Sequence, residues 1–332
     1  MRISIIIVAH DRKKYLIDAI KSIQKQVLDI TDYEIVIIKS FKDELIDSFI
    51  AGIHATNIFT EELSLGSKLR LGIEASNGDV LTFLEDDDIF FDGKLKFLID
   101  KFKNKNLGYI HNDYLCLNEY GKPIDLRRRS VLKSPLHMKQ SSGVYNFLRM
   151  AIKAQGFFNL SCISIRRNLL TAESLKFLDH MQIAVDNFMF YIGCNSGLDV
   201  LITNEKYTGY RIHSQNNSFY LGGDLAEFVK KKIRFLGSNI YGYGCIEKII
   251  SNAELTSFLA SREKMSCLAY NILVGKSFST QYKVKFNEFL NAYYITRSWE
   301  LFALFLMFKI SKIFPVQVKR FYFLYEKMKF TP

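Results

Sequence analysis

The stretch that decides the predicted fold of this chain is a hydrophobic run ending in four acids, Asn77-Gly78-Asp79-Val80-Leu81-Thr82-Phe83-Leu84-Glu85-Asp86-Asp87-Asp88. Its first two residues are a helix stop signal, and the apolar residues that follow suit a buried strand. Adjacent carboxylates repel one another, and burying them is costly unless a cation compensates their charge. Carboxylate oxygens suit Mg²⁺ or Mn²⁺. The alternative interpretation is a solvated acidic turn that opens a helix at Asp92.

The segments around this stretch alternate between strand and helix patterns. Strands that alternate with helices at short spacing indicate an α/β fold with a mainly parallel, Rossmann-like sheet flanked by helices. Open sheets of this kind bind ligands at the carboxyl ends of their strands, where the acidic run lies. We expect strands over residues 3–9, 34–38, 55–59, 79–84 and 107–111, and helices over residues 16–27, 43–50, 64–76 and 92–102.

The pattern changes toward the C-terminus. Residues 121–142 are polar and basic and predict a long loop, whereas residues 160–165 predict a strand and residues 183–194 a helix. From about residue 225 onward the pattern is helical, with aromatic residues throughout. We therefore predict a catalytic domain over residues 1–222 and a helical, basic and aromatic-rich C-terminal region over residues 223–332.

Composition and motifs exclude several classes of protein. An apolar share of 48% argues against a mainly disordered chain. The five cysteines are scattered and form no CxxC pair, which disfavours a zinc site or a disulfide framework and fits a reducing compartment. The N-terminal apolar run is too short for a signal peptide. The absence of GxGxxG and GxxxxGK[ST] disfavours a dinucleotide-binding domain and a P-loop NTPase. We therefore expect a cytoplasmic protein.

Three segments together resemble glycosyltransferase family 2. They are the first strand with His10-Asp11-Arg12, the helical segment from Gly66 to Ile73, and the stretch over residues 77–88. The resemblance covers roughly residues 1–220. It implies the GT-A fold, a nucleotide-sugar donor, a divalent metal (Mg²⁺ or Mn²⁺) and inversion at the anomeric carbon.

The resemblance also implies roles for the residues that match the family's motifs. Asp87 and Asp88 would bind the metal, and Glu85 would lie near the ribose or the metal. Asp186 matches the acid that acts as general base on the acceptor hydroxyl. His213, in the segment Tyr210-Arg211-Ile212-His213, would contact the metal or the donor pyrophosphate. The remaining donor contacts are assigned to His10, Arg12, Lys68, Arg70, Asp86 and Arg211.

Two departures from the family's pattern bear on substrate choice. Lys39 follows the second strand where the family commonly has an acid that reads uracil, so both UDP-type and GDP-type donors remain open. The Q/RxxRW motif of processive members is absent near Trp299, which favours a single addition over polymerisation. Val185 stands where a glutamate usually precedes the catalytic acid.

The resemblance thus implies a metal-dependent inverting glycosyltransferase that adds one sugar to an acceptor hydroxyl of a glycan or a lipid-linked acceptor. One alternative is a nucleotidyltransferase on a related fold, which would typically carry a Gly-rich basic loop after the first strand. Another is a catalytically inactive interaction module at a membrane surface, against which the intact Asp87 and Asp88 argue.

The net charge of +11 is concentrated near the C-terminus, since residues 275–332 contain ten basic and three acidic residues. Aromatic residues mixed with lysine and arginine suit a helix at a membrane interface. We therefore predict a peripheral location on an anionic membrane, at the inner face. The alternative is a helix pair that covers the catalytic domain or forms an oligomer interface. Nucleic acid is disfavoured because no recognisable binding module is present.

Overall fold

The computed structural model describes residues 1–10, 12–62, 64–125, 132–139, 143–179, 181–213, 216, 224–275 and 282–328. The chain divides into two compact units. The sheet unit comprises residues 1–124, 130–142 and 151–212, and the helical unit comprises residues 125–129, 143–150 and 213–332. Asp11 and part of the loop predicted over residues 121–142 lie outside the described residues.

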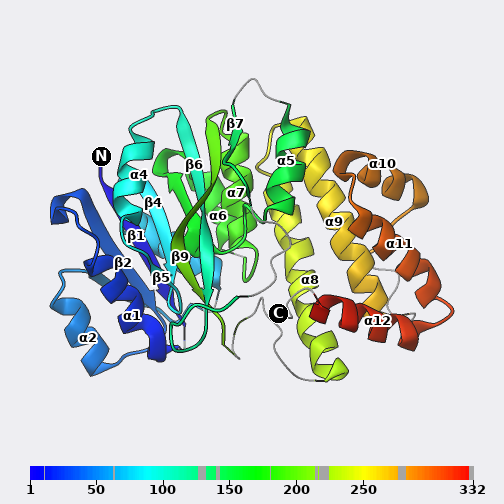
Figure 1. The fold of residues 1–332 in the computed structure, drawn as a ribbon, viewed down its shortest axis with the longest axis horizontal. Helices are drawn as coiled ribbons and strands as arrows, with labels where there is room; N and C mark the ends of the chain where they lie inside the picture. The colour runs from blue at the N-terminus through cyan, green and yellow to red at the C-terminus, as the bar shows by residue number, and fades with distance from the viewer. Residues whose placement is uncertain are drawn as a thin grey trace. The chain divides into compact units, whose positions relative to one another are not determined.

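The sheet unit is built on one mixed sheet, nine-stranded within the described residues (Figure 1). Its strands follow the order β3-β2-β1-β4-β8-β6-β9-β5, and β7 pairs with β9. β1 pairs in parallel with β2 and β4, and β6 in parallel with β9, whereas β8 is antiparallel to both its neighbours. The strands are β1 (Ile3–Ala9), β2 (Tyr33–Lys39), β3 (Thr56–Phe59), β4 (Val80–Glu85), β5 (Ile89–Phe90), β6 (Leu107–Leu117), β7 (Leu136–Met138), β8 (Ile163–Arg166) and β9 (Asp199–Arg211).

Helices connect these strands and form the second unit. Short 3-10 segments occur at η1 (Ile30–Asp32), η2 (Leu160–Cys162) and η3 (Arg167–Leu169). The helices are α1 (Lys13–Gln24), α2 (Glu44–Ala51), α3 (Leu65–Glu74), α4 (Lys94–Phe102), α5 (Val144–Lys153), α6 (Ala172–Leu178), α7 (Val185–Asn195), α8 (Leu225–Glu247), α9 (Ala253–Val274), α10 (Phe286–Thr296), α11 (Trp299–Ser311) and α12 (Pro315–Met328).

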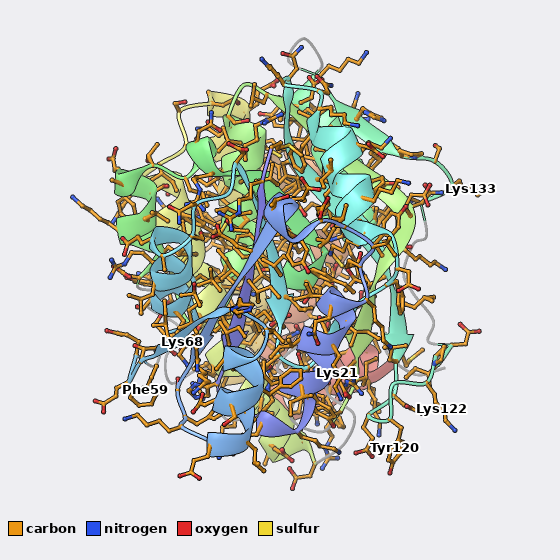
Figure 2. All side chains as sticks on the ribbon, turned by 90° about the vertical axis from the view of Figure 1, so that its left-hand side faces the viewer. Lys21, Phe59, Lys68, Tyr120, Lys122 and Lys133 are labelled. Atoms are coloured by element: carbon orange, nitrogen blue, oxygen red, sulfur yellow. The ribbon has the colours of Figure 1, made fainter. Side chains whose placement is uncertain are left out.

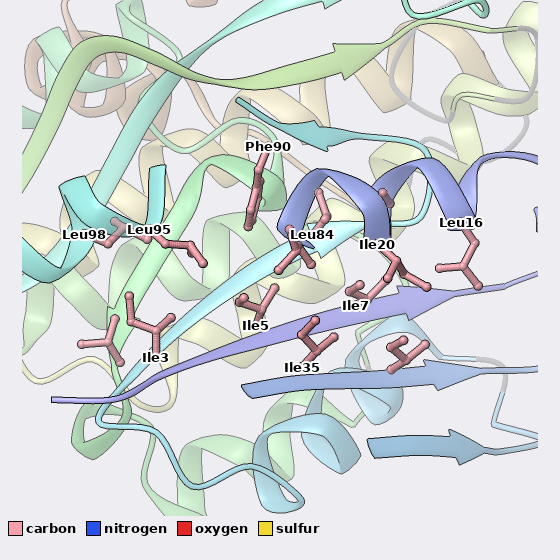
Figure 3. Packing of buried hydrophobic residues seen from close by; sticks show 14 of the residues in the cluster. Ile3, Ile5, Ile7, Leu16, Ile20, Ile35, Leu84, Phe90, Leu95 and Leu98 are labelled. Atoms are coloured by element: carbon pink, nitrogen blue, oxygen red, sulfur yellow. The ribbon is translucent and has the colours of Figure 1, made fainter. Parts of the chain in front are cut away.

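β1 is apolar except at Ser4 because both faces of the sheet are covered. Ile5 and Ile7 join a buried cluster with Leu16 and Ile20 of α1 (Figure 3). Ile6 points to the opposite face, where Gly72 of α3 packs so closely that a Cβ there would lie 2.6 Å from Ile6. Alternating side chains therefore bury against helices on either side, as in a parallel α/β sheet.

The two glycines of the deciding motifs are explained by close packing. A Cβ on Gly78 would lie 2.6 Å from the backbone nitrogen of Ser4, and one on Gly66 would lie 1.7 Å from the carbonyl oxygen of Leu178. The Gly78 amide also donates to Glu34 Oε1 at 3.0 Å. This hydrogen bond to a carboxylate on β2 holds the turn that leads into β4. The acidic run follows at the carboxyl end of β4.

The helical unit has its own core. Phe289 of α10 stacks on Phe305 of α11, with ring centroids 4.0 Å apart. Leu268 of α9 and Val318 of α12 belong to the same buried cluster. Within the described residues, none of the helices combines the length and the apolarity that a membrane crossing requires.

The predicted α/β class, with a mostly parallel sheet flanked by helices and a helical C-terminal region, is confirmed. The long strand β9 was not predicted, because its middle carries the polar and exposed residues Glu205 and Lys206 and breaks the apolar pattern. The predicted border between residues 222 and 223 stays a prediction, since residues 217–223 lie outside the described part of the chain.

Candidate active site

The acidic run forms a tight buried turn at the carboxyl end of β4. The Asp88 amide donates to the Glu85 carbonyl at 3.2 Å, which closes the turn before β5 begins. Asp86, Asp87 and Asp88 are almost completely buried, and Glu85 is partly exposed. Four consecutive carboxyl groups therefore lie in a setting that penalises their charge.

Arg12 supplies positive charge to this turn. Its guanidinium ion-pairs with Asp86 at 2.7 Å and also with Asp87. Arg12 follows β1, which lies beside β4 in the sheet, so the two strand ends bring these residues together. Arg12, a predicted donor contact, thus lies beside the acidic run in the sheet unit; its role toward the donor stays a prediction.

Asp88 is held by neutral donors. Its Oδ2 accepts hydrogen bonds from Asn159 Nδ2 at 2.8 Å and from Ser161 Oγ at 2.7 Å. Its Oδ1 accepts one from the backbone N–H of Arg211 at 3.0 Å. Hydrogen bonds to a carboxylate favour its charged form, and three of them fix its orientation.

Burial dominates the protonation of the turn. It raises the pKa of Asp86 to about 7, with Arg12 opposing the shift and Asp87 adding to it. Burial also raises the pKa of Asp88 to about 7, against the hydrogen bonds from Ser161, Arg211 and Asn159. The pKa of Glu85 lies well above its ordinary value because of burial and the neighbouring carboxylates. Burial thus favours protonation of the turn, and a bound cation would favour the ionised forms.

His10 and Lys68 meet beside the turn. Lys68 Nζ lies 2.6 Å from His10 Nδ1, and the His10 amide donates to Asp86 Oδ2 at 3.3 Å. Lys68 is buried on α3 and is labelled in Figure 2, whereas His10 is exposed at the end of β1. These two predicted donor residues are therefore linked to each other and to the acidic run.

Arg211 braces the turn from the end of β9. Its Nε donates to the Asp87 carbonyl at 2.8 Å and its Nη1 to the Glu119 carbonyl at 3.0 Å. Its guanidinium carbon lies 4.5 Å from the centre of the Tyr15 ring. The side chain is buried and already engaged in holding the backbone, so its predicted contact with a diphosphate stays a prediction.

Asp186 lies in the first turn of α7, after Ala184 in a left-handed conformation. Its Oδ1 accepts from the Asn187 amide at 2.8 Å. Burial raises the pKa of Asp186 to about 6, and backbone N–H groups of Asn187 and Asn159 oppose this shift. A carboxylate with this pKa is ionised at neutral pH and can accept a proton.

Asn159 connects the two acidic sites. Its side chain donates to Asp88, and its backbone N–H is near enough to Asp186 to oppose the rise in the pKa of that carboxyl. Its φ of 70° lies in the left-handed region, which an asparagine tolerates better than most residues. Two acids far apart in the sequence thus share one neighbour.

Lys94 donates hydrogen bonds to buried groups of the same region. Its Nζ donates to the Ser161 carbonyl at 2.5 Å and to Thr208 Oγ1 at 3.1 Å, and the side chain is fully buried. Burial lowers the pKa of Lys94 to about 7, and Asp88 opposes that shift. Neither Lys94 nor Asn159 was predicted, because Lys94 follows a plain helix start at Gly93 and no local pattern marks Asn159.

Two predicted residues, Arg70 and His213, have hydrogen-bond or ion-pair partners outside the acidic turn. Arg70 pairs with Asp179 at 2.5 Å and with Glu74 at 3.0 Å on the outer side of α3. His213 belongs to the helical unit, where its amide donates to Asn216 Oδ1 at 2.6 Å. Their predicted roles stay predictions. Among the described residues, no three His, Cys, Asp or Glu side chains are arranged to bind a metal ion.

Sequence comparisons match the first half of the chain. Residues 4–162 match the family model for glycosyl transferase family 2. An uncharacterized glycosyltransferase of Rickettsia bellii (strain RML369-C) is 26% identical over 128 residues. That similarity covers 37% of this chain and 18% of the relative. The predicted resemblance to this family is confirmed.

Structural comparisons match a larger part of the chain. The structure of S. aureus TarS 1-349 has a TM-score of 0.55 and 11% identity, and the match covers 96% of this chain and 89% of that one. The same protein in complex with UDP-GlcNAc has a TM-score of 0.51 and 10% identity, with 90% and 91% covered. This chain spans half the length of another TarS structure, at a TM-score of 0.52 and 12% identity. These likenesses confirm the predicted GT-A fold.

Proposed function

We propose that this chain, whose residues 4–162 match the family model for glycosyl transferase family 2, transfers one sugar from a nucleotide-sugar donor to an acceptor hydroxyl. The acceptor attacks the anomeric carbon directly, so that the configuration there inverts. The observation that carries the proposal is the link through Asn159 between Asp88 of the acidic turn and Asp186. A donor site and a base must be neighbours for such a displacement.

Asp186 acts as the base in this proposal. Its ionised carboxylate takes the proton of the acceptor hydroxyl as the bond to the sugar forms. The amide of Asn187 donates to this carboxylate and orients it. Because α7 begins one residue earlier, the helix dipole also favours the ionised form.

The acidic turn is proposed to hold Mg²⁺ or Mn²⁺. Its adjacent carboxyl groups offer oxygen ligands, which suit a hard divalent cation. Asp87 and Asp88 are the proposed ligands, together with Glu85. Because Asp87 pairs with Arg12, metal binding requires Arg12 to move aside or to turn to the donor phosphates. A bound divalent cation would neutralise charge on the leaving diphosphate.

The donor is proposed to be a UDP-type or GDP-type sugar. His10 and Arg12 follow the carboxyl end of β1, and Lys68 of α3 lies against His10. Cationic side chains beside the acidic turn suit a diphosphate. Lys39 at the end of β2 pairs with Asp47 at 2.7 Å and is buried. The two TarS complexes contain UDP-GlcNAc and UDP, which makes UDP-sugars the first donors to test.

We place the protein at the inner face of the cytoplasmic membrane, with a glycan or lipid-linked acceptor. The basic and aromatic composition of residues 275–332 supports this location.

The first test is a thermal-shift screen of UDP-sugars and GDP-sugars, each with Mn²⁺ and with a chelator. A ligand at 100 times its Kd stabilises the folded state by about 2.7 kcal/mol. We therefore expect one donor to raise Tm by several degrees, and to do so only with Mn²⁺. If every nucleotide sugar leaves Tm unchanged with Mn²⁺ present, the proposal is wrong.

A further inference from the structure

The helix α11 is apolar on all sides, although only one side faces the core of the helical unit. Leu301, Leu304 and Phe305 are buried in that core. The opposite side carries apolar residues spaced by three or four, which places them in one band. We call this band the outer stripe: Trp299, Phe302, Leu306 and Ile310, continued by Ile313 just beyond the helix.

The outer stripe is well exposed. Trp299 is 75% exposed, Ile313 72%, and Leu306 and Ile310 nearly half. A second apolar band lies on α12, where Phe321, Leu324 and Met328 are also exposed. Contiguous exposed apolar residues of this kind mark an interaction surface.

Charge identifies the partner of this surface. Lys309 and Lys312 are exposed beside the outer stripe, and Arg320 and Lys327 beside the band on α12. The few acids of this region are mostly committed elsewhere, since Glu326 is buried against Lys232 at 2.5 Å and Glu288 caps α10. A second copy of the chain would oppose one basic face with another. An anionic surface with an apolar interior complements both properties.

Length identifies the mode of contact. α11 has 13 residues and is therefore about 20 Å long, shorter than the roughly 30 Å of hydrocarbon that a spanning helix must cross. A short helix with one apolar exposed band and flanking lysines lies in the plane of the interface.

We propose that the outer stripe of α11 is the surface that docks this protein on an anionic lipid bilayer. Trp299, Leu306 and Ile310 enter the headgroup and acyl boundary, and Lys309 and Lys312 contact lipid phosphates. This inference specifies the membrane location within the proposed function, and it does not depend on the sugar transfer itself.

Trp299 provides a direct readout, because it is the only tryptophan of the chain. Vesicles of phosphatidylcholine that contain roughly a third phosphatidylglycerol should shift the Trp299 emission to the blue. Vesicles of phosphatidylcholine alone should have a much smaller effect. The double variant Leu306→Glu/Ile310→Glu should bind the anionic vesicles at least about tenfold more weakly in flotation. Lys309→Glu/Lys312→Glu should lose the preference for anionic lipid.

The control is Leu45→Glu, which alters an exposed leucine on α2 of the sheet unit and should bind vesicles like the wild type. Circular dichroism and the donor-induced thermal shift are measured on every variant. Vesicle binding without any donor response would contradict the proposed function and leave this inference standing. Unchanged Trp299 emission with anionic vesicles, or full binding by both double variants, would overturn it. A blue shift that grows with protein concentration in the absence of lipid would also overturn it, in favour of self-association.

Discussion

Replacing Asp186 with Asn should lower turnover by roughly 10²–10⁴-fold, the usual contribution of a positioned general base. Asparagine keeps the acceptor for the Asn187 amide but cannot take a proton from the acceptor hydroxyl. We therefore expect a large loss in kcat with little change in donor affinity or Tm. Steady-state kinetics and donor titrations measure the two effects separately.

The pH profile gives a second signature of the same residue. Burial raises the pKa of Asp186 to about 6, so the carboxylate is ionised above that pH and protonated below it. At saturating Mn²⁺, which favours the ionised form of the metal-binding carboxylates, log kcat/KM of the wild type should fall with decreasing pH, with a slope approaching one below pH 6. Asp186→Asn should lack this limb. The control is Glu173→Gln in the first turn of α6, which should behave like the wild type. Near wild-type turnover in Asp186→Asn would exclude Asp186 as the base.

Replacing Asp87 with Ala should abolish stimulation by Mn²⁺ and lower turnover by roughly 10²–10⁴-fold. A metal at a leaving diphosphate contributes several kcal/mol to transition-state stabilisation, and each 1.36 kcal/mol is about tenfold in rate. Stability should not fall, because the substitution also relieves repulsion among the four carboxyl groups of the turn. Initial rates against Mn²⁺ concentration provide the measurement.

The control for this variant is Asp92→Asn, an exposed acid that follows the same turn. It should retain the metal response of the wild type. An Asp87→Ala enzyme that Mn²⁺ still stimulates to the same extent would mean that the metal binds elsewhere.

The sequence was sufficient to predict the elements whose residue pattern is local. The β-branched run of β1 predicts a strand buried on both faces, and Ile5, Ile6 and Ile7 alternate between two helical layers as expected. The run into Asp86 and Asp87 likewise predicts a charged turn at a strand end. Both depend only on neighbouring residues.

The sequence was insufficient where tertiary contacts decide. β9 has a polar middle, and its pairing with β6 rather than its own pattern makes it a strand. Asn159 lies in the site because its backbone adopts a left-handed conformation and because its acidic neighbours, Asp88 and Asp186, come from distant segments. Lys94 is buried beneath Ser161, although lysines on helices are usually solvated. No local signal marks such residues.

The most direct test of the central claim is release of nucleoside diphosphate from a nucleotide sugar, with water as the acceptor. It is measured with Mn²⁺ and with a chelator for the wild type, Asp87→Ala and Asp186→Asn. We predict release by the wild type only with Mn²⁺, and a loss of at least about 10²-fold in both variants. No release from any UDP-sugar or GDP-sugar, or release that both variants retain, would contradict the account.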